Sequence, residues 1–417
     1  MTESAAVLGA PVNRRIAYLA ALISFGVKGV CAFAITYLLA RTLSFHDFGL
    51  WSTMFSIGTV LGVSELGVGQ LILTTFHETK IRGAEADRLV TNAVAAMSAL
   101  SVALLIVISF AFSWFHVLDD LRWRALLLAT ILVRLVVVPH GAYLSALERY
   151  HERKIAEAVS FLASAVFIYW GVSVKADLSM LLIGMNAIVT VGACGVAVRA
   201  VQLGMPRVRF SDIVPAQIRT VFATSFPYFV SNVSSLATYG GFIALSSMIL
   251  PAAEIARLAL LHNMLLMHVM QIGELVFRSL QPRMRDAALM RKLELGIAGT
   301  CALGLTVAVT AGSWLFSQVF KKYEYSRAEL AVYVIFVFLE VLFLLLTSAM
   351  QMRSAHRLRL QWLSLLKAGA FLVVLGLAAM LWKTPTILSY AALLVVYSAG
   401  MAGLTWHYEH RDPEMVR

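Results

Sequence analysis

Charged residues are scarce in this sequence. Asp, Glu, Lys and Arg make up only 14% of its 417 residues, whereas soluble domains carry roughly 25%. Hydrophobic residues account for 60%, and the mean hydropathy is +0.81. Apolar runs long enough to cross a bilayer, about 20 residues each, recur from end to end. The composition argues against a water-soluble globular protein and predicts an all-α integral membrane protein, because helices satisfy their own backbone hydrogen bonds in lipid.

Cysteine is also rare, and the common catalytic patterns are missing from the sequence. Cys31, Cys194 and Cys301 lie inside apolar segments without the spacing of metal ligands, so we expect neither a disulfide framework nor a metal site. The GxxxxGK[ST] phosphate-binding pattern does not occur, which argues against ATP hydrolysis by this chain. Serine, histidine and acidic residues form no catalytic arrangement. We therefore expect no enzymatic activity and no cofactor.

Basic residues outnumber acidic ones, giving a formal net charge of +11. Nucleic-acid-binding proteins gather such charge on soluble faces or tails. Here the basic residues lie between apolar runs instead. We therefore expect the lipid bilayer as a partner and no nucleic acid.

Twelve apolar segments are long enough to span a membrane. They are too close together for any loop to hold a folded extramembrane domain. The expected spans cover residues 14–40, 48–74, 89–115, 121–147, 154–174, 178–201, 218–250, 253–280, 292–320, 327–352, 357–382 and 385–407.

The lysines and arginines of the loops predict the orientation of these spans. With the N-terminus inside, 22 of them fall on the cytoplasmic side and nine on the opposite side, while Lys28, Arg134 and Lys367 lie within spans. Because cytoplasmic loops are enriched in Lys and Arg, we predict that both termini face the cytoplasm. If one span were absent, every later loop would change sides and the two counts would become similar. The observed bias therefore favours an even number of spans.

The longest polar connection, residues 202–217, lies midway along the chain. It divides the sequence into two expected six-helix bundles, residues 1–205 and 206–417. A similar segment follows the first span of each half: LSFHDFG at 43–49 and LPAAEIA at 250–256. The two segments share Leu at the first place and an acidic residue at the fifth. These segments indicate parallel repeats. Alternatively, both are polar turns whose acidic residue favours the first turn of a helix.

Six ionisable residues are expected well inside spans: Lys28, Arg134, Lys367, Glu65, Glu274 and Glu340. A charge at mid-span costs about 2.5–3.5 kcal/mol on insertion scales, so each needs a partner or a wet cavity. Lys28 and Arg134 come out at a similar depth, about 20 Å from the cytoplasmic helix ends. They predict an anion site, with Lys367 as a third cation. The alternative is a structural ion pair of Lys28 or Arg134 with Glu65.

The seventh and eighth spans carry further candidate substrate-binding residues. Asn232 belongs to a stretch rich in hydroxyl and small residues, which suits either a cavity wall or close helix packing. Gln271 and Arg278 lie on one polar stripe of the eighth span with Glu274. Glu274 and Arg278 are also spaced to neutralise each other.

Buried carboxylates are candidates for coupling transport to an ion gradient. An unpaired buried carboxylate prefers its neutral form, so alternating exposure to the two sides of the membrane can load and release a proton. We rank Glu65 and Glu340 before Glu274, which has Arg278 one turn away. Glu340 has no basic residue within a turn on its own helix, which makes it the freer group if no other helix supplies one.

The segment YLLARTLSFHDFGLWSTMFSIGTVLGVSELGVGQLIL, residues 37–73, resembles the N-terminal signature of Wzx-type flippases. These belong to the multidrug/oligosaccharidyl-lipid/polysaccharide exporter superfamily, and their signature reads A-R-x-L-G-x-x-x-F-G-x-[YW], followed by D-x-G-x-G. Ser44 replaces the usual Gly and Glu65 the usual Asp. The matching residues are Ala40, Arg41, Leu43, Phe48, Gly49, Trp51, Gly67 and Gly69.

This resemblance implies two six-helix bundles around a central cavity. It also implies transport of an undecaprenyl-diphosphate-linked oligosaccharide from the cytoplasmic to the periplasmic leaflet of the bacterial inner membrane, for O-antigen, capsule or exopolysaccharide synthesis. The partners implied are the polysaccharide polymerase and the chain-length regulator. The alternative within the superfamily is a multidrug or peptidoglycan-precursor exporter. A membrane-embedded polymerase or ligase is the rival from another class, but it would be expected to carry a large periplasmic loop.

Overall fold

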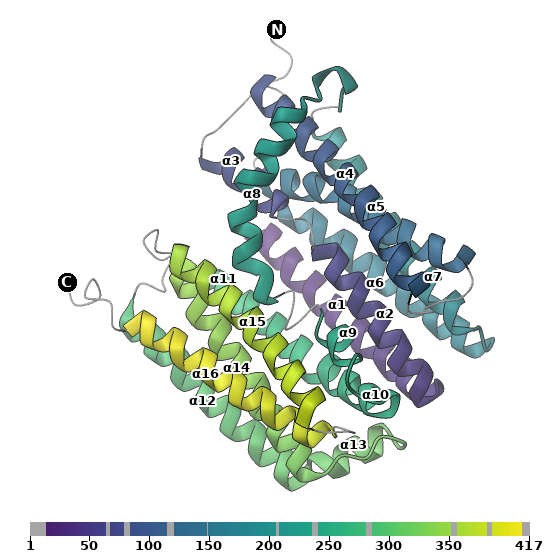
Figure 1. Cartoon of the computed structure of the whole chain (residues 1–417), viewed down its shortest axis with the longest axis vertical. Coiled ribbons are helices and arrows are strands. Elements are labelled where there is room, and N and C mark those ends of the chain that lie inside the picture. Colours follow the sequence, from purple (N-terminus) through teal and green to yellow (C-terminus); the bar gives the residue numbers. More distant parts are fainter. Residues whose placement is uncertain are drawn as a thin grey trace. The chain divides into compact units, whose positions relative to one another are not determined.

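The computed structural model describes residues 14–63, 67–78, 84–114, 121–147, 149–205, 208–235, 241–280, 286–351, 357–381 and 386–410. Within these ranges every regular element is a helix and no strand occurs, so the all-α prediction is confirmed (Figure 1).

Within the described residues, the first half of the chain forms seven α-helices and one short 3₁₀ turn, η1. They are α1 (Arg14–Thr42), α2 (Phe45–Val63), α3 (Val68–Glu78), α4 (Ala84–Trp114), α5 (Leu121–Ala146), α6 (Tyr150–Ser173), α7 (Leu178–Gln202) and η1 (Phe210–Asp212).

Two π-helical turns, η3 and η5, interrupt long helices of the second half. The elements are α8 (Pro215–Ser235), α9 (Phe242–Ser246), α10 (Ala252–Leu261), η3 (His262–Leu266), α11 (Met267–Leu280), α12 (Ala287–Val307), η5 (Ala308–Gly312), α13 (Ser313–Val319), α14 (Arg327–Gln351), α15 (Arg357–Leu381) and α16 (Ile387–His410).

The twelve expected spans each coincide with one helix or with consecutive helices. Eight match a single helix, while the span 48–74 corresponds to α2 and α3, and 218–250 to α8 and α9. The spans 253–280 and 292–320 each contain a π turn. Among the described residues, nine helical stretches are by themselves long and apolar enough to cross a membrane.

Side-chain caps explain why several helices begin where they do. Ser44 accepts a hydrogen bond from the Asp47 backbone N–H at 3.0 Å ahead of the first turn of α2. Asp177 accepts one from Met180 N at the start of α7, at 2.8 Å. Such oxygens satisfy backbone donors that have no partner inside the helix.

The described chain forms two compact units that interleave along the sequence. One comprises Met1–Leu38 and Ile57–Phe229, and the other Leu39–Ser56 and Val230–Arg417. The division between residues 205 and 206 stays a prediction. The end of α1 and the start of α2 pack in the second unit. There a Cβ on Gly49 would lie 3.1 Å from the Ala252 carbonyl oxygen.

Apolar side chains form the interior of each unit. In the first unit, α3, α4 and α5 pack through Ile72, Met97 and Leu135, all fully buried. In the second, the Phe242 ring stacks on His262 and Phe336, with centroids 4.9 and 5.8 Å apart. Large apolar side chains also remain exposed on α1 and α6, as expected for surfaces that contact lipid acyl chains.

Candidate functional site

Lys28 lies on α1 and faces an acidic residue of α6. Its Nζ is 3.2 Å from Glu157 Oε2 and 5.0 Å from the centroid of the Phe161 ring. Glu157 also contacts Arg153 Nε at 3.1 Å and Lys154 Nζ at 3.0 Å. The sequence considered alone missed Glu157 as the partner of Lys28, since 129 residues separate them. The only local signal was the spacing of Arg153, Lys154 and Glu157 along one helical turn.

Arg134 lies on α5 and contacts α7. Its Nη2 donates to Asn186 Oδ1 at 2.8 Å, and Asn186 is held in turn by donating to the Leu182 carbonyl at 2.8 Å. Among the described residues, Arg134 Nε is buried without a hydrogen-bond partner. Lys28 and Arg134 therefore belong to the same unit but have different partners, and the described contacts include no direct one between them.

Lys367 of α15 and Glu340 of α14 form an ion pair in the interior of the second unit. Nζ is 2.5 Å from Glu340 Oε2, and the two side chains are only 1% and 0% exposed. Ser398 of α16 donates to the other carboxylate oxygen at 2.7 Å, and the ammonium lies 3.6 Å from the centroid of the Phe343 ring. A neighbouring helix thus supplies the basic partner that Glu340 lacks on its own helix.

The remaining candidates are described less completely. Gln271 is half-buried on α11. Asn232 lies on α8, and Glu274 and Arg278 lie on α11, but their side chains are outside the described part of the structure. Glu65, both as a coupling group and as the alternative partner of Lys28 or Arg134, lies outside the described residues.

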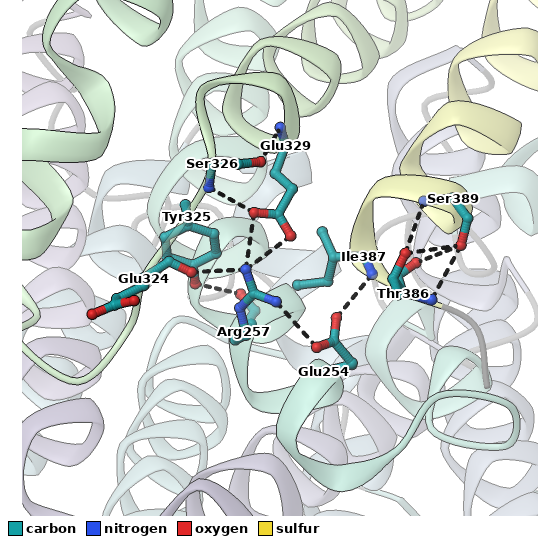
Figure 2. A network of polar contacts seen from close by, with 9 residues as sticks. All are labelled: Glu254, Arg257, Glu324, Tyr325, Ser326, Glu329, Thr386, Ile387 and Ser389. Atoms are coloured by element: carbon teal, nitrogen blue, oxygen red, sulfur yellow. Dashed lines mark hydrogen bonds and ion pairs between the residues drawn. The ribbon is translucent and has the colours of Figure 1, made fainter.

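Arg257 of α10 is the centre of a network that the sequence analysis did not identify (Figure 2). Its Nη2 lies 2.8 and 2.9 Å from the two carboxylate oxygens of Glu329 and 2.7 Å from the Glu324 carbonyl oxygen, while Nη1 lies 3.0 Å from Glu254. Glu254 also accepts from the backbone N–H of Ile387 at 2.8 Å. The guanidinium thereby links α10 to the beginnings of α14 and α16.

The loop before α14 completes the Arg257 network. Ser326 and Glu329 cap α14 reciprocally. The Ser326 backbone N–H donates to Glu329 Oε2 at 2.7 Å, and the Glu329 backbone N–H donates to Ser326 Oγ at 3.1 Å. Tyr325 donates its hydroxyl to the Arg257 carbonyl at 2.7 Å. Burial raises the pKa of the Tyr325 phenol, so it stays protonated as a donor. The S-x-x-E spacing was the sequence signal for this cap, and the network is best explained as a structural tie between helices.

Comparison with known proteins gives matches among solved structures only. No protein-family model and no curated protein sequence matches the chain. The lipid II flippase MurJ in an inward closed conformation aligns with a TM-score of 0.70 at 10% identity, over 94% of this chain and 87% of that one.

Multidrug transporters align over similar lengths. An inward-facing MATE family transporter of the MOP superfamily gives a TM-score of 0.65 at 12% identity, covering 93% of this chain and 97% of that one. The MATE multidrug transporter DinF-BH gives 0.64 at 17% identity, over 98% and 97% of the two chains. The chain therefore has the fold that these transporters share with the lipid II flippase.

Proposed function

We propose that this protein is a flippase that moves undecaprenyl-diphosphate-linked oligosaccharides from the cytoplasmic to the periplasmic leaflet of the bacterial inner membrane. The observation that carries the proposal is the placement of two cations, Lys28 and Arg134, within helices of one unit whose chain has the fold of a lipid flippase. The signature in residues 37–73 supports the same class of substrate.

A diphosphate passing through an apolar membrane needs cations to replace its hydration. Arg134 suits this role because its guanidinium has a buried Nε without a partner among the described residues. Lys28 is 26% exposed in its side chain and can rearrange toward a ligand. Lys367 is a proposed contact as well, although its ammonium first has to leave Glu340. Asn232, Gln271 and Arg278 are the proposed contacts of the second unit.

Ion coupling is a separate part of this proposal. We place it on Glu65 or Glu340 before Glu274. Since Lys367 neutralises Glu340, an incoming proton or sodium ion would have to compete with a tethered ammonium at this carboxylate. Flipping by wild type, Glu65→Gln and Glu340→Gln with and without imposed pH and sodium gradients tests this role. Full gradient dependence in both variants would show that these two acids do not couple transport.

The function itself is tested in proteoliposomes that contain a fluorescent lipid-linked oligosaccharide. The expected result is protein-dependent movement of the label between leaflets. In cells, deletion should accumulate the substrate in the cytoplasmic leaflet. Two results together would contradict the proposal: the label stays on its original leaflet in proteoliposomes, and deletion leaves the leaflet distribution of the substrate in cells unchanged.

Export of drugs or of a peptidoglycan precursor is the second candidate. The observation that favours it is the structural similarity to multidrug transporters and to a lipid II flippase. The same proteoliposomes distinguish the candidates. Transport of a cationic dye or of lipid II, in place of the lipid-linked oligosaccharide, would support this second function.

A further inference from the structure

Three cations surround a single carboxylate between α1 and α6. Lys28, Arg153 and Lys154 each lie within 3.2 Å of an oxygen of Glu157. One carboxylate balances one of these charges, so the cluster carries a surplus of two positive charges. By the predicted topology Arg153 and Lys154 lie at the cytoplasmic membrane surface, where such a surplus attracts the phosphates of anionic lipid headgroups.

The adjacent ion pairs add to the surplus. Arg149 and Arg199 share the carboxylate of Glu152, at 2.7 and 2.8 Å. Together with Lys28, Arg153 and Lys154 they make five cations. Within the described residues, all ion pairs of these five are to Glu152 and Glu157, so five positive charges face two negative ones. Two helices and the end of a third therefore present a net positive surface.

The surplus charge lies next to surfaces suited to acyl chains. Val27 and Val30 flank Lys28 on α1 and are 37% and 70% exposed, while Val159, two residues after Glu157 on α6, is 59% exposed. A Cβ on Gly26 would meet nothing within 4 Å among the described residues, so no other described side chain covers α1 at this position.

The cationic side chains remain partly accessible. The side chains of Lys28 and Lys154 are 26% and 20% exposed, and that of Arg153 is 44% exposed. Arg153 donates its Nε to Glu157, and among the described residues its terminal nitrogens make no hydrogen bond. Arginine and lysine donors of this kind bind phosphate oxygens through charge-assisted hydrogen bonds.

We propose that Lys28, Arg153 and Lys154, arranged around Glu157, form a binding site for the phosphate of an anionic lipid. The phosphate comes either from a phospholipid of the bilayer or from the diphosphate of the transported lipid. The second source rests on the proposed function, and the first does not. Glu157 occupies the site when the lipid is absent, and the phosphate competes with it for the three cations.

Native mass spectrometry of the full-length protein in non-ionic detergent tests the site. Phosphatidylglycerol, phosphatidylcholine and undecaprenyl diphosphate are titrated separately. We expect phosphatidylglycerol to bind more tightly than phosphatidylcholine. The triple variant Lys28→Gln, Arg153→Gln, Lys154→Gln should lose at least about tenfold in affinity, the factor that corresponds to one charge-assisted hydrogen bond. The control Lys292→Gln removes an exposed lysine from α12 and should bind as wild type does.

Glu157→Gln provides a test that a merely structural cluster would not pass. Removing the competing carboxylate should raise the affinity for phosphatidylglycerol, whereas a structural ion pair would lose stability without binding more lipid. Tighter binding of undecaprenyl diphosphate than of phosphatidylglycerol identifies the transported lipid as the source, and the reverse order identifies the bilayer. Unchanged affinities in both the triple variant and Glu157→Gln would overturn the site. Flipping by the wild-type protein, in which Lys28 is intact, reports on the proposed function separately.

Discussion

At the residue scale, the charged residues within helices differ in what surrounds them. Lys367 and Glu340 form an ion pair sealed from solvent, whereas Lys28 shares its acid with two other cations. A matched buried pair stabilises a specific arrangement of helices, while an unbalanced cluster retains capacity for an anion. Lys367 and Glu340 therefore have to separate before either can contact a ligand, whereas the cations around Glu157 are already partly accessible.

The buried pair leads to a stability prediction. Lys367→Met leaves Glu340 without its ammonium partner and should lower the free energy of unfolding by about 3–5 kcal/mol. Adding Glu340→Gln to Lys367→Met should restore most of this loss, because a neutral amide can still accept from Ser398. Thermal unfolding of the purified variants in detergent measures both effects. A single variant as stable as wild type would contradict the structural role of the pair.

Arg134 leads to a transport prediction. Arg134→Ala should reduce flipping at least about tenfold, as expected for loss of one charge-assisted contact to the diphosphate, with an unchanged amount of protein in the membrane. Asn186→Ala removes the described hydrogen-bond partner of Arg134 but keeps the guanidinium, so it should reduce flipping less. Lys28→Ala is expected to impair flipping in the same way. Recovery of flipping in Lys28→Ala with Glu157→Gln would instead identify a structural ion pair.

At the scale of elements, polar networks tie together helices that meet outside the apolar interior. The guanidinium of Arg257 reaches α14 and Glu254 reaches the backbone of α16 (Figure 2). The π turns of the described residues, η3 and η5, lie in the second half, and η3 ends a few residues before Gln271. π turns of this kind often occur at functional positions, which supports α11 as part of the proposed substrate path.

The Arg257 network leads to a prediction for the helix ends. Arg257→Leu leaves the carboxylates of Glu254 and Glu329 without their shared cation. The free energy of unfolding should fall by about 2–4 kcal/mol, less than for a fully buried pair because water partly screens these groups. Arg327→Leu is the matched control, since Arg327 is exposed in the first turn of α14. Thermal unfolding compares the two variants. Equal effects would show that the network contributes nothing beyond surface charge.

At the scale of the whole molecule, the charge distribution predicts topology. Both termini and the loops at residues 76–88, 149–154 and 203–217 should face the cytoplasm, because 22 of the basic residues lie on that side of the expected spans and nine on the other.

Cysteine accessibility in a background without Cys31, Cys194 and Cys301 checks this topology. Glu85→Cys, in the first turn of α4, should react only with reagents that reach the cytoplasm. Asp119→Cys should react from the periplasm, although residue 119 lies outside the described ranges. Labelling of Glu85→Cys from the periplasm would contradict the predicted orientation.

The sequence alone determined the helical segments and where many of them begin. An apolar stretch of about 20 residues in lipid has to form a helix, because the backbone finds no other hydrogen-bond partners there. Local signals such as Ser44 with Asp47 then set the start of a helix. These features depend on residues close together in the chain, so the sequence contains the information directly.

Only the tertiary structure decided which charges meet. Lys28 pairs with Glu157 across 129 residues, and Arg257 with Glu329 across 72. Even Lys367 and Glu340, 27 residues apart, meet because two neighbouring helices pack in one particular register. The energy of such a pair depends on burial, distance and geometry, and these arise only when helices distant in the sequence pack together.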